Sequence, residues 1–140
     1  MTSVFEYAIL GSATAFLIYS IYQRFFHTEP LPPPPPPTAE HRDYTLFELS
    51  QYTGADPTKP ILMSGNIYDV TPKASMYGPG GPYHNFTGTD ASRALGKGVT
   101  DRSEANNTNW TDLTSDEMQQ LDEWAGFYSA RYQKIGNLIE

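Results

Sequence analysis

The segment from Tyr77 to Tyr83 restricts the fold of this chain more than any other stretch. It reads Tyr-Gly-Pro-Gly-Gly-Pro-Tyr, with three glycines and two prolines in seven residues. Proline lacks a backbone N–H and has a fixed φ, so neither a helix nor a central strand can continue through it. Glycine turns tightly and lets the backbone lie close against a flat ligand. The segment therefore predicts a tight loop framed by two phenolic oxygens, which is either an ordinary turn or one wall of a ligand site.

The residues after this loop extend the pattern. Residues 86–95 read Phe-Thr-Gly-Thr-Asp-Ala-Ser-Arg-Ala-Leu, and Asp90 stands where an N-cap would stand, ahead of a short helix. From about Tyr44 to Leu138 the order of residues resembles the membrane-associated progesterone receptor family, a branch of the cytochrome-b5-like haem-binding fold. The resemblance implies an α+β domain that binds haem.

The same resemblance implies the residues of the site. Tyr83 would be the axial ligand of the haem iron, and Tyr77 would line the same pocket. Arg131 and Tyr132 match a family pair, usually lysine-tyrosine, that contacts haem; arginine keeps the charge but changes the geometry. The implied cofactor is ferric haem b, because a hard anionic oxygen ligand favours ferric iron. His84 directly follows the ligand position and is the alternative ligand, although adjacent residues in an extended loop usually point apart.

Two capping boxes predict where helices begin. The first, Thr45–Glu48, opens a short helix, and the second, Thr114–Glu117, opens the longest helix of the chain. Apolar residues recur at helical spacing after the second box, so we expect this helix to reach about Lys134 and to stop at Gly136.

Two short runs of strand-forming residues lie between the two boxes. They are Ile61–Met63 and Ile67–Val70, and Ser64-Gly-Asn66 between them indicates a hairpin. Short strands mixed with short helices predict an α+β domain, which we place at residues 42–140.

The N-terminal region predicts a membrane anchor over residues 1–27. Val4–Tyr22 holds 19 residues with one charge, Glu6, and as a helix it would be roughly 28 Å long, close to the ~30 Å hydrocarbon core of a bilayer. Arg24 and His27 follow this run, which predicts a single-pass anchor with the domain facing the cytosol. The membrane that we expect is that of the endoplasmic reticulum. A cleaved signal peptide is the alternative, disfavoured because no basic residue precedes the apolar run.

Two further features of the N-terminal third concern partners. Gly11 and Ala15 form a small-xxx-small pair, which lets membrane helices approach closely, so a homodimer is an alternative to a monomer. A proline-rich linker at residues 28–41 contains six consecutive prolines, Pro32–Pro37, which predict a polyproline II rod of roughly 19 Å. The rod is either a stiff spacer, the reading we favour, or a ligand for proline-binding modules.

Composition excludes several classes of function. The net charge is −7, and residues 38–140 hold 8 basic and 14 acidic residues, so nucleic acid is not expected as a partner. The chain has no cysteine, which excludes disulfides and thiolate ligation of haem. It also lacks a nucleophile elbow, a P-loop, a Rossmann fingerprint and a zinc-helix motif, so we do not expect an enzyme. Three sequons, at Asn85, Asn106 and Asn109, are interpreted as coincidental in a cytosolic domain.

Three functions are compatible with these patterns. The first, implied by the resemblance, is a membrane-anchored haem-binding protein that supports a haem-thiolate sterol monooxygenase in ergosterol-type sterol synthesis. The second is a steroid- or sterol-binding membrane adaptor without a working haem site. The third is an electron-transfer component. It is disfavoured because none of the three histidines (His27, His41 and His84) lies in the His-Pro-Gly-Gly context of electron-carrying cytochrome b5 proteins.

Overall fold

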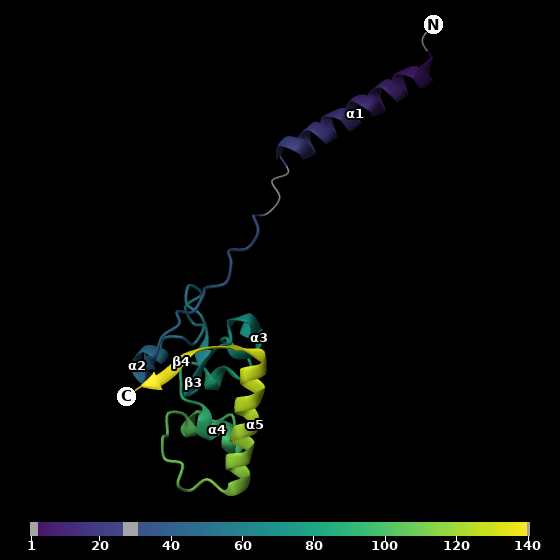
Figure 1. Ribbon diagram of the computed structural model, residues 1–140. Coiled ribbons are helices and arrows are strands. Elements are labelled where there is room, and N and C mark those ends of the chain that lie inside the picture. Colours follow the sequence, from purple (N-terminus) through teal and green to yellow (C-terminus); the bar gives the residue numbers. More distant parts are fainter. Residues whose placement is uncertain (1–2, 27–30, 140) are drawn as a thin grey trace. The chain divides into compact units, whose positions relative to one another are not determined.

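The computed structural model describes residues 3–26 and 31–139, which belong to two compact units, Met1–Pro34 and Pro35–Glu140 (Figure 1). The first unit contains the expected helix, α1, at Val4–Phe26. Glu6 in its first turn and Arg24 in its last turn both complement the helix dipole. Among the residues that the structure describes, no helix is both long and apolar enough to cross a membrane, so the span expected over Val4–Tyr22 is not shown.

A four-stranded sheet organises the second unit. Its strands are β1 (Tyr44–Thr45), β2 (Leu62–Met63), β3 (Asn66–Asp69) and β4 (Gln133–Ile139), in the order β1-β4-β3-β2. The expected hairpin is confirmed, since β2 and β3 pair antiparallel. β4 pairs antiparallel with β3 and parallel with β1, so the last strand of the chain holds the first strand in the sheet.

The two helices that the capping boxes predict are both present. α2 (Leu46–Leu49) follows Thr45 and α5 (Ser115–Arg131) follows Thr114, and both capping boxes form. Between them lie α3 (Ala74–Tyr77), α4 (Ser92–Lys97) and three 3₁₀ turns, at Thr71–Lys73, His84–Phe86 and Arg102–Glu104. Figure 1 shows α4 beside α5, with α2 near the end of β4.

The sheet separates two apolar cores, because successive side chains of a strand point to opposite faces. Leu62 and Ile67 pack on one face together with Tyr44, Leu49 and Ile135. Met63 and Tyr68 pack on the other face, in a larger cluster that includes Tyr77, Phe86, Leu95 and Tyr128. The second face is therefore the one on which Tyr77 and Tyr83, the two tyrosines of the Gly-Pro loop (residues 77–83), meet the long helix α5.

Two sequence-based boundaries are wrong. The long helix ends at Arg131 instead of Lys134, and Gly136 lies inside β4, where a Cβ would collide with the carbonyl of Arg42. The predicted helix stop is therefore a glycine needed for close approach of two backbones. The helix expected directly after Asp90 begins at Ser92, and Asp90 instead accepts hydrogen bonds from the N–H (3.0 Å) and the hydroxyl (2.6 Å) of Ser92.

Candidate functional site

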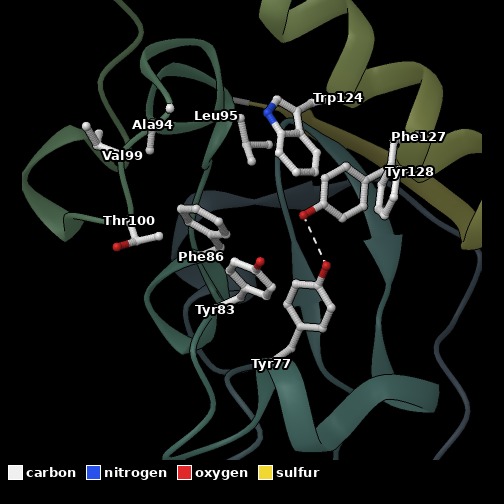
Figure 2. A pocket seen from close by; sticks show the side chains of 11 residues that line it. Tyr77, Tyr83, Phe86, Ala94, Leu95, Val99, Thr100, Trp124, Phe127 and Tyr128 are labelled. Carbon is white, nitrogen blue, oxygen red and sulfur yellow. Dashed lines mark hydrogen bonds between the residues drawn. The ribbon is translucent and has the colours of Figure 1, made fainter.

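An apolar slot opens between the Gly-Pro loop, the end of α4 and the long helix α5 (Figure 2). Its volume is about 280 Å³. Most of its wall is aromatic or aliphatic, and its exposed rim is formed by residues 98–100. The lining residues are Tyr77, Tyr83, Phe86, Ala94, Leu95, Gly98, Val99, Thr100, Trp124, Phe127 and Tyr128.

The glycines of the loop bring Tyr83 to this slot. α3 ends at Tyr77, and the chain reverses so that the Tyr83 N–H donates to the carbonyl of Met76 at 2.9 Å. Gly80 adopts a φ of +82°, and a Cβ on Gly81 would collide with the Met76 carbonyl. Only glycine fits such a close return, so the Tyr83 ring comes to lie 5.7 Å from the Tyr77 ring.

Tyr83 is half-buried, and its hydroxyl is directed into the slot (Figure 2). Its ring stacks on Phe86 at 5.9 Å with an interplanar angle of 7°. Within residues 3–26 and 31–139, no group forms a hydrogen bond with the Tyr83 hydroxyl. A fixed ring with an unpartnered oxygen at an apolar slot is available to bind a ligand atom.

The hydroxyl of Tyr77 is engaged with a residue of α5. Tyr77 and Tyr128 are both buried, and their hydroxyl oxygens lie 3.1 Å apart (Figure 2). Burial, together with this hydrogen bond, raises the pKa of Tyr77 far above its ordinary value. Burial also raises the pKa of Tyr128 to about 12. Both phenols therefore stay neutral at physiological pH, and their paired hydroxyls form the polar spot in the wall of the slot.

Arg131 and Tyr132 lie next to the slot without lining it. The Tyr132 ring packs against Tyr77 (5.9 Å) and Tyr128 (5.6 Å), behind the wall of the slot. The exposed guanidinium of Arg131 sits 4.0 Å from the centre of the Phe127 ring, which does line the slot. Tyr77 and Tyr83 are thus brought together in the slot, whereas a contact of Arg131 or Tyr132 with haem stays a prediction.

His84 is not part of the slot lining. Its Nδ1 lies 3.4 Å from the carbonyl oxygen of Tyr77 and 3.5 Å from the hydroxyl of Thr87. Among the other histidines, His41 pairs with Gln133 at 2.9 Å, and His27 lies outside the described residues. No group of three or more His, Cys, Asp or Glu side chains that could hold a metal ion occurs in the described part of the chain.

Sequence reasoning missed the contribution of α5 to the slot. On this helix only the C-terminal end, at Arg131 and Tyr132, was expected to contact haem, whereas Trp124, Phe127 and Tyr128 are the residues that line the slot. The signal was present in their spacing, since i, i+3 and i+4 fall on one helix face. That this face lines the slot depends on where α5 packs, which the spacing alone does not reveal.

A buried arginine fixes the loop that supplies the rim of the slot. Arg93 is 5% exposed and reaches Glu104 at 2.5 Å and Asp112 at 2.5 and 2.7 Å. The side-chain amide of Asn85 donates to the Thr100 carbonyl at 3.0 Å. Hydrogen bonding to Arg93 lowers the pKa of Asp112 to about 2 and lowers the pKa of Glu104 as well. The segment from Gly98 to Leu113 is therefore held at both ends by polar contacts.

Comparison with known proteins identifies the domain. Residues 45–138 match the family described as cytochrome b5-like heme/steroid binding domain. This chain belongs to that family. The predicted cytochrome-b5-like fold is confirmed, and so is the resemblance to membrane-associated progesterone receptor proteins, since the curated relatives include membrane steroid-binding and progesterone receptor component proteins.

Three similar proteins illustrate this membership. Membrane steroid-binding protein 1 from Oryza sativa subsp. japonica is 40% identical over 119 residues, covering 79% of this chain and 46% of the rice protein. Cytochrome P450 regulator dap1 from Schizosaccharomyces pombe is 38% identical over 107 residues, covering 71% of this chain and 64% of dap1. A solved Arabidopsis thaliana structure with a cytochrome b5-like fold has a TM-score of 0.64 at 37% identity, covering 74% of this chain and 96% of that one. The chain thus spans between about half and two-thirds of the length of these two curated relatives.

Proposed function

We propose that this protein binds ferric haem b in the slot, with Tyr83 as the axial ligand, and that it supports a haem-thiolate sterol monooxygenase. The observation that carries the proposal is the unpartnered hydroxyl of Tyr83, directed into an apolar, aromatic-walled slot. Two comparisons support the proposal. The description of the matching family names haem and steroid as ligands, and one relative is named as a cytochrome P450 regulator.

The slot has the chemistry that a flat macrocycle requires. Its walls include Phe86, Leu95, Trp124 and Phe127, and its volume of about 280 Å³ lies just below the roughly 300–1,000 Å³ of ligand pockets. The exposed rim at residues 98–100 lets a plate-like group enter by one edge. The site therefore fits haem, with one oxygen ligand and apolar contact to the ring faces.

The residues around Tyr83 have distinct proposed roles. Tyr83 would bind iron through its phenolate oxygen, and its half-buried position at the slot leaves that oxygen open to a ligand atom. The Tyr77–Tyr128 pair stays neutral and offers a hydroxyl donor without adding charge. Arg131 and Tyr132, at the end of α5, would hold the propionates. Haem bound in this way would supply a ferric iron of low reduction potential, which suits binding, transfer or sensing more than rapid electron transport.

The proposed setting is the cytosolic face of the endoplasmic reticulum membrane, with residues 1–27 as the anchor. Relatives named membrane steroid-binding proteins support membrane association, as do the exposed apolar side chains of α1, such as Ile9, Phe16 and Ile18. A homodimer through Gly11 and Ala15 remains part of this hypothesis. The protein would act as a regulator and not as an enzyme, in line with relatives named for binding and regulation.

A second candidate function is steroid binding by a membrane adaptor. A separate cavity of about 240 Å³ lies on the other side of Leu95 and Tyr128, with Trp110, Met118 and Leu121 in its wall. Its wall also carries Ser64, Asn66, Ser92 and Asp122, so the cavity combines apolar contact with polar groups that would bind the hydroxyl of a sterol. A sterol that protects the protein thermally but leaves the haem spectrum unchanged would favour this candidate.

The decisive experiment is titration of the purified protein with hemin. We expect one equivalent to bind and to give a ferric absorption spectrum. Tyr83→Phe keeps the stacked ring but deletes the oxygen, so affinity should fall at least tenfold. His84→Ala is the matched control and should bind like the wild type. Equal binding by Tyr83→Phe and the wild type, or a larger loss in His84→Ala, would contradict the assignment.

A further inference from the structure

The proline run is highly exposed. Leu31, directly before it, is 90% exposed, and Pro32–Pro36 are all exposed, whereas Pro37 is half-buried. A single exposed leucine is ordinary on a protein surface. Here, however, it continues into six proline rings, which together form an uninterrupted apolar segment without a basic residue.

The conformation of such a segment is fixed before any partner arrives. Each proline locks its own φ and pushes the preceding residue toward extended values, so the run adopts polyproline II. With three residues per turn, residues i and i+3 share an edge, which gives three overlapping pairs: 32 with 35, 33 with 36, and 34 with 37. Leu31 falls on the edge of Pro34. Ordering such a segment on a partner costs little entropy, and aromatic-lined grooves recognise this spacing.

The C-terminal end of the run is attached firmly to the domain. Ala39 is 7% exposed and packs in the core beside Tyr44 and Leu49. The Tyr44 hydroxyl donates to the carbonyl of Glu40 at 2.8 Å. Only Thr38 therefore separates the last proline, Pro37, from a buried position, and the prolines themselves remain outside the core.

The charges beside the run indicate the type of partner. Arg42 is the nearest arginine on the domain side, but its guanidinium is engaged by Glu48 (3.0 Å), by Glu40 (3.4 Å) and by the ring of Tyr44 (4.0 Å). The Glu40 side chain is itself 82% exposed, and Asp43 is exposed as well. The accessible flank of the segment is therefore acidic, and a groove with an acidic rim would be repelled.

We propose that Leu31–Pro37, in addition to serving as the stiff spacer favoured from the sequence, is a docking segment for a protein module with an aromatic groove and a basic rim. The proline rings fill the groove, Leu31 adds an apolar contact at one end, and Glu40 faces the basic rim at the other. This interaction is independent of the haem slot, so the segment recruits a second protein in addition to whatever the domain binds.

Titration of the full chain, in detergent, against purified proline-binding modules tests the proposal. The probes are an EVH1 domain with a basic groove rim and an SH3 domain with an acidic rim, each followed by the fluorescence of its groove tryptophan. We expect the basic-rimmed module to bind at least tenfold more tightly than the acidic-rimmed one, with an affinity that falls as salt rises.

Three variants localise the binding. Replacing Pro33, Pro34 and Pro35 by serine breaks all three i, i+3 pairs and should weaken binding at least tenfold, and Glu40→Gln should weaken it about threefold. Pro57→Ser, at an exposed proline of the domain, is the matched control and should have no effect. The hemin spectrum should stay unchanged in every variant. Undiminished binding by the triple variant, or tighter binding by the acidic-rimmed module, would overturn the proposal.

Discussion

Tyr83 and His84 are adjacent in the chain, and both side chains can bind a metal ion, but they lie in different surroundings. Tyr83 lines the slot and has an unpartnered hydroxyl, whereas His84 faces the Tyr77 carbonyl and Thr87. The turn that follows Gly81 produces this difference, because it fixes the backbone of both residues. Tyr128, on α5, completes the site by engaging the other tyrosine of the loop.

The Tyr77–Tyr128 pair predicts a loss of stability in alkali. In the folded domain the pKa of Tyr77 is raised strongly and that of Tyr128 to about 12, whereas free phenols titrate near ~10. The stabilisation from these neutral phenols is therefore complete below pH ~10 and is lost as pH rises above it. We expect the melting temperature to fall between pH 9 and 12, as followed by circular dichroism.

Tyr77→Phe separates this effect from general alkaline unfolding. The variant should be less stable at pH 7 by about 1–3 kcal/mol, because the buried Tyr128 hydroxyl loses its partner. Its melting temperature should, however, decline less steeply above pH 10. Tyr52→Phe, on the other face of the sheet, is the control and should keep the wild-type slope. An equal slope in Tyr77→Phe and the wild type would contradict the assignment.

At the scale of elements, β4 is the component that completes the domain. It lies between β1 and β3, and its Ile135 is buried at 4% exposure. From the sequence, the start of β4 was predicted as the last turn of the long helix, to Lys134, and Gly136 was predicted as the residue that stops this helix. The reason is that the helical spacing of apolar residues in the seventeen residues of α5 leads directly into β4. The close approach of Gly136 to the Arg42 backbone depends on this pairing.

Two glycine substitutions test this arrangement with opposite expected signs. Gly136→Ala places a Cβ against the carbonyl of Arg42 and should destabilise the domain by about 1–3 kcal/mol, as overpacking does. Gly126→Ala lies inside α5, where nothing lies within 4 Å, and should stabilise it by about 0.5–1 kcal/mol. Urea unfolding measures both. Equal effects of the two substitutions would refute the pairing of β4 at this register.

The segment from Gly98 to Leu113 should loosen in acid. Arg93 lowers the pKa values of Asp112, to about 2, and of Glu104, so both carboxylates stay ionised below their ordinary range. Their stabilisation is present above about pH 4 and is lost as pH falls toward 2. Amide hydrogen exchange in the segment should accelerate over this window. Asp112→Asn should exchange fast already at pH 7 and flatten the pH dependence, whereas Asp116→Asn, at the exposed start of α5, should behave like the wild type; a wild-type profile in Asp112→Asn would contradict this role of Arg93.

At the scale of the whole molecule, the chain is acidic, with a net charge of −7. The exposed face of α5 adds to this character, since Asp116 and Glu123 border a shallow polar hollow. Acidic surfaces steer encounters with basic partners, and the effect declines with ionic strength. The domain therefore presents the apolar slot and an acidic face of α5 at the same time.

This charge predicts how the proposed monooxygenase partner associates. Binding of the full chain to a membrane-bound sterol monooxygenase, in vesicles, should weaken as salt rises beyond 0.1 M, where the screening length is ~10 Å. Reversing Asp116 and Glu123 to lysine should weaken it further, and loss of the protein in cells should raise sterol intermediates. Tyr83→Phe then decides whether haem matters: full support of sterol synthesis by this variant would make the protein a scaffold. Unchanged sterol intermediates after loss of the protein would contradict the proposed role itself.

The sequence by itself determined the features that arise from neighbouring residues. The Gly-Pro loop, the two capping boxes and the β2–β3 hairpin follow from restricted φ values and from short-range hydrogen bonds, so residues 45–49, 62–69 and 114–117 could be predicted correctly. Tertiary structure decided the contacts between distant residues. The Tyr77–Tyr128 pair, the Arg93–Asp112 ion pair and the position of β4 between β1 and β3 join residues far apart in the chain. Their free energy appears only when the segments pack together, because burial and strand pairing supply it, and no local pattern encodes which segments will meet.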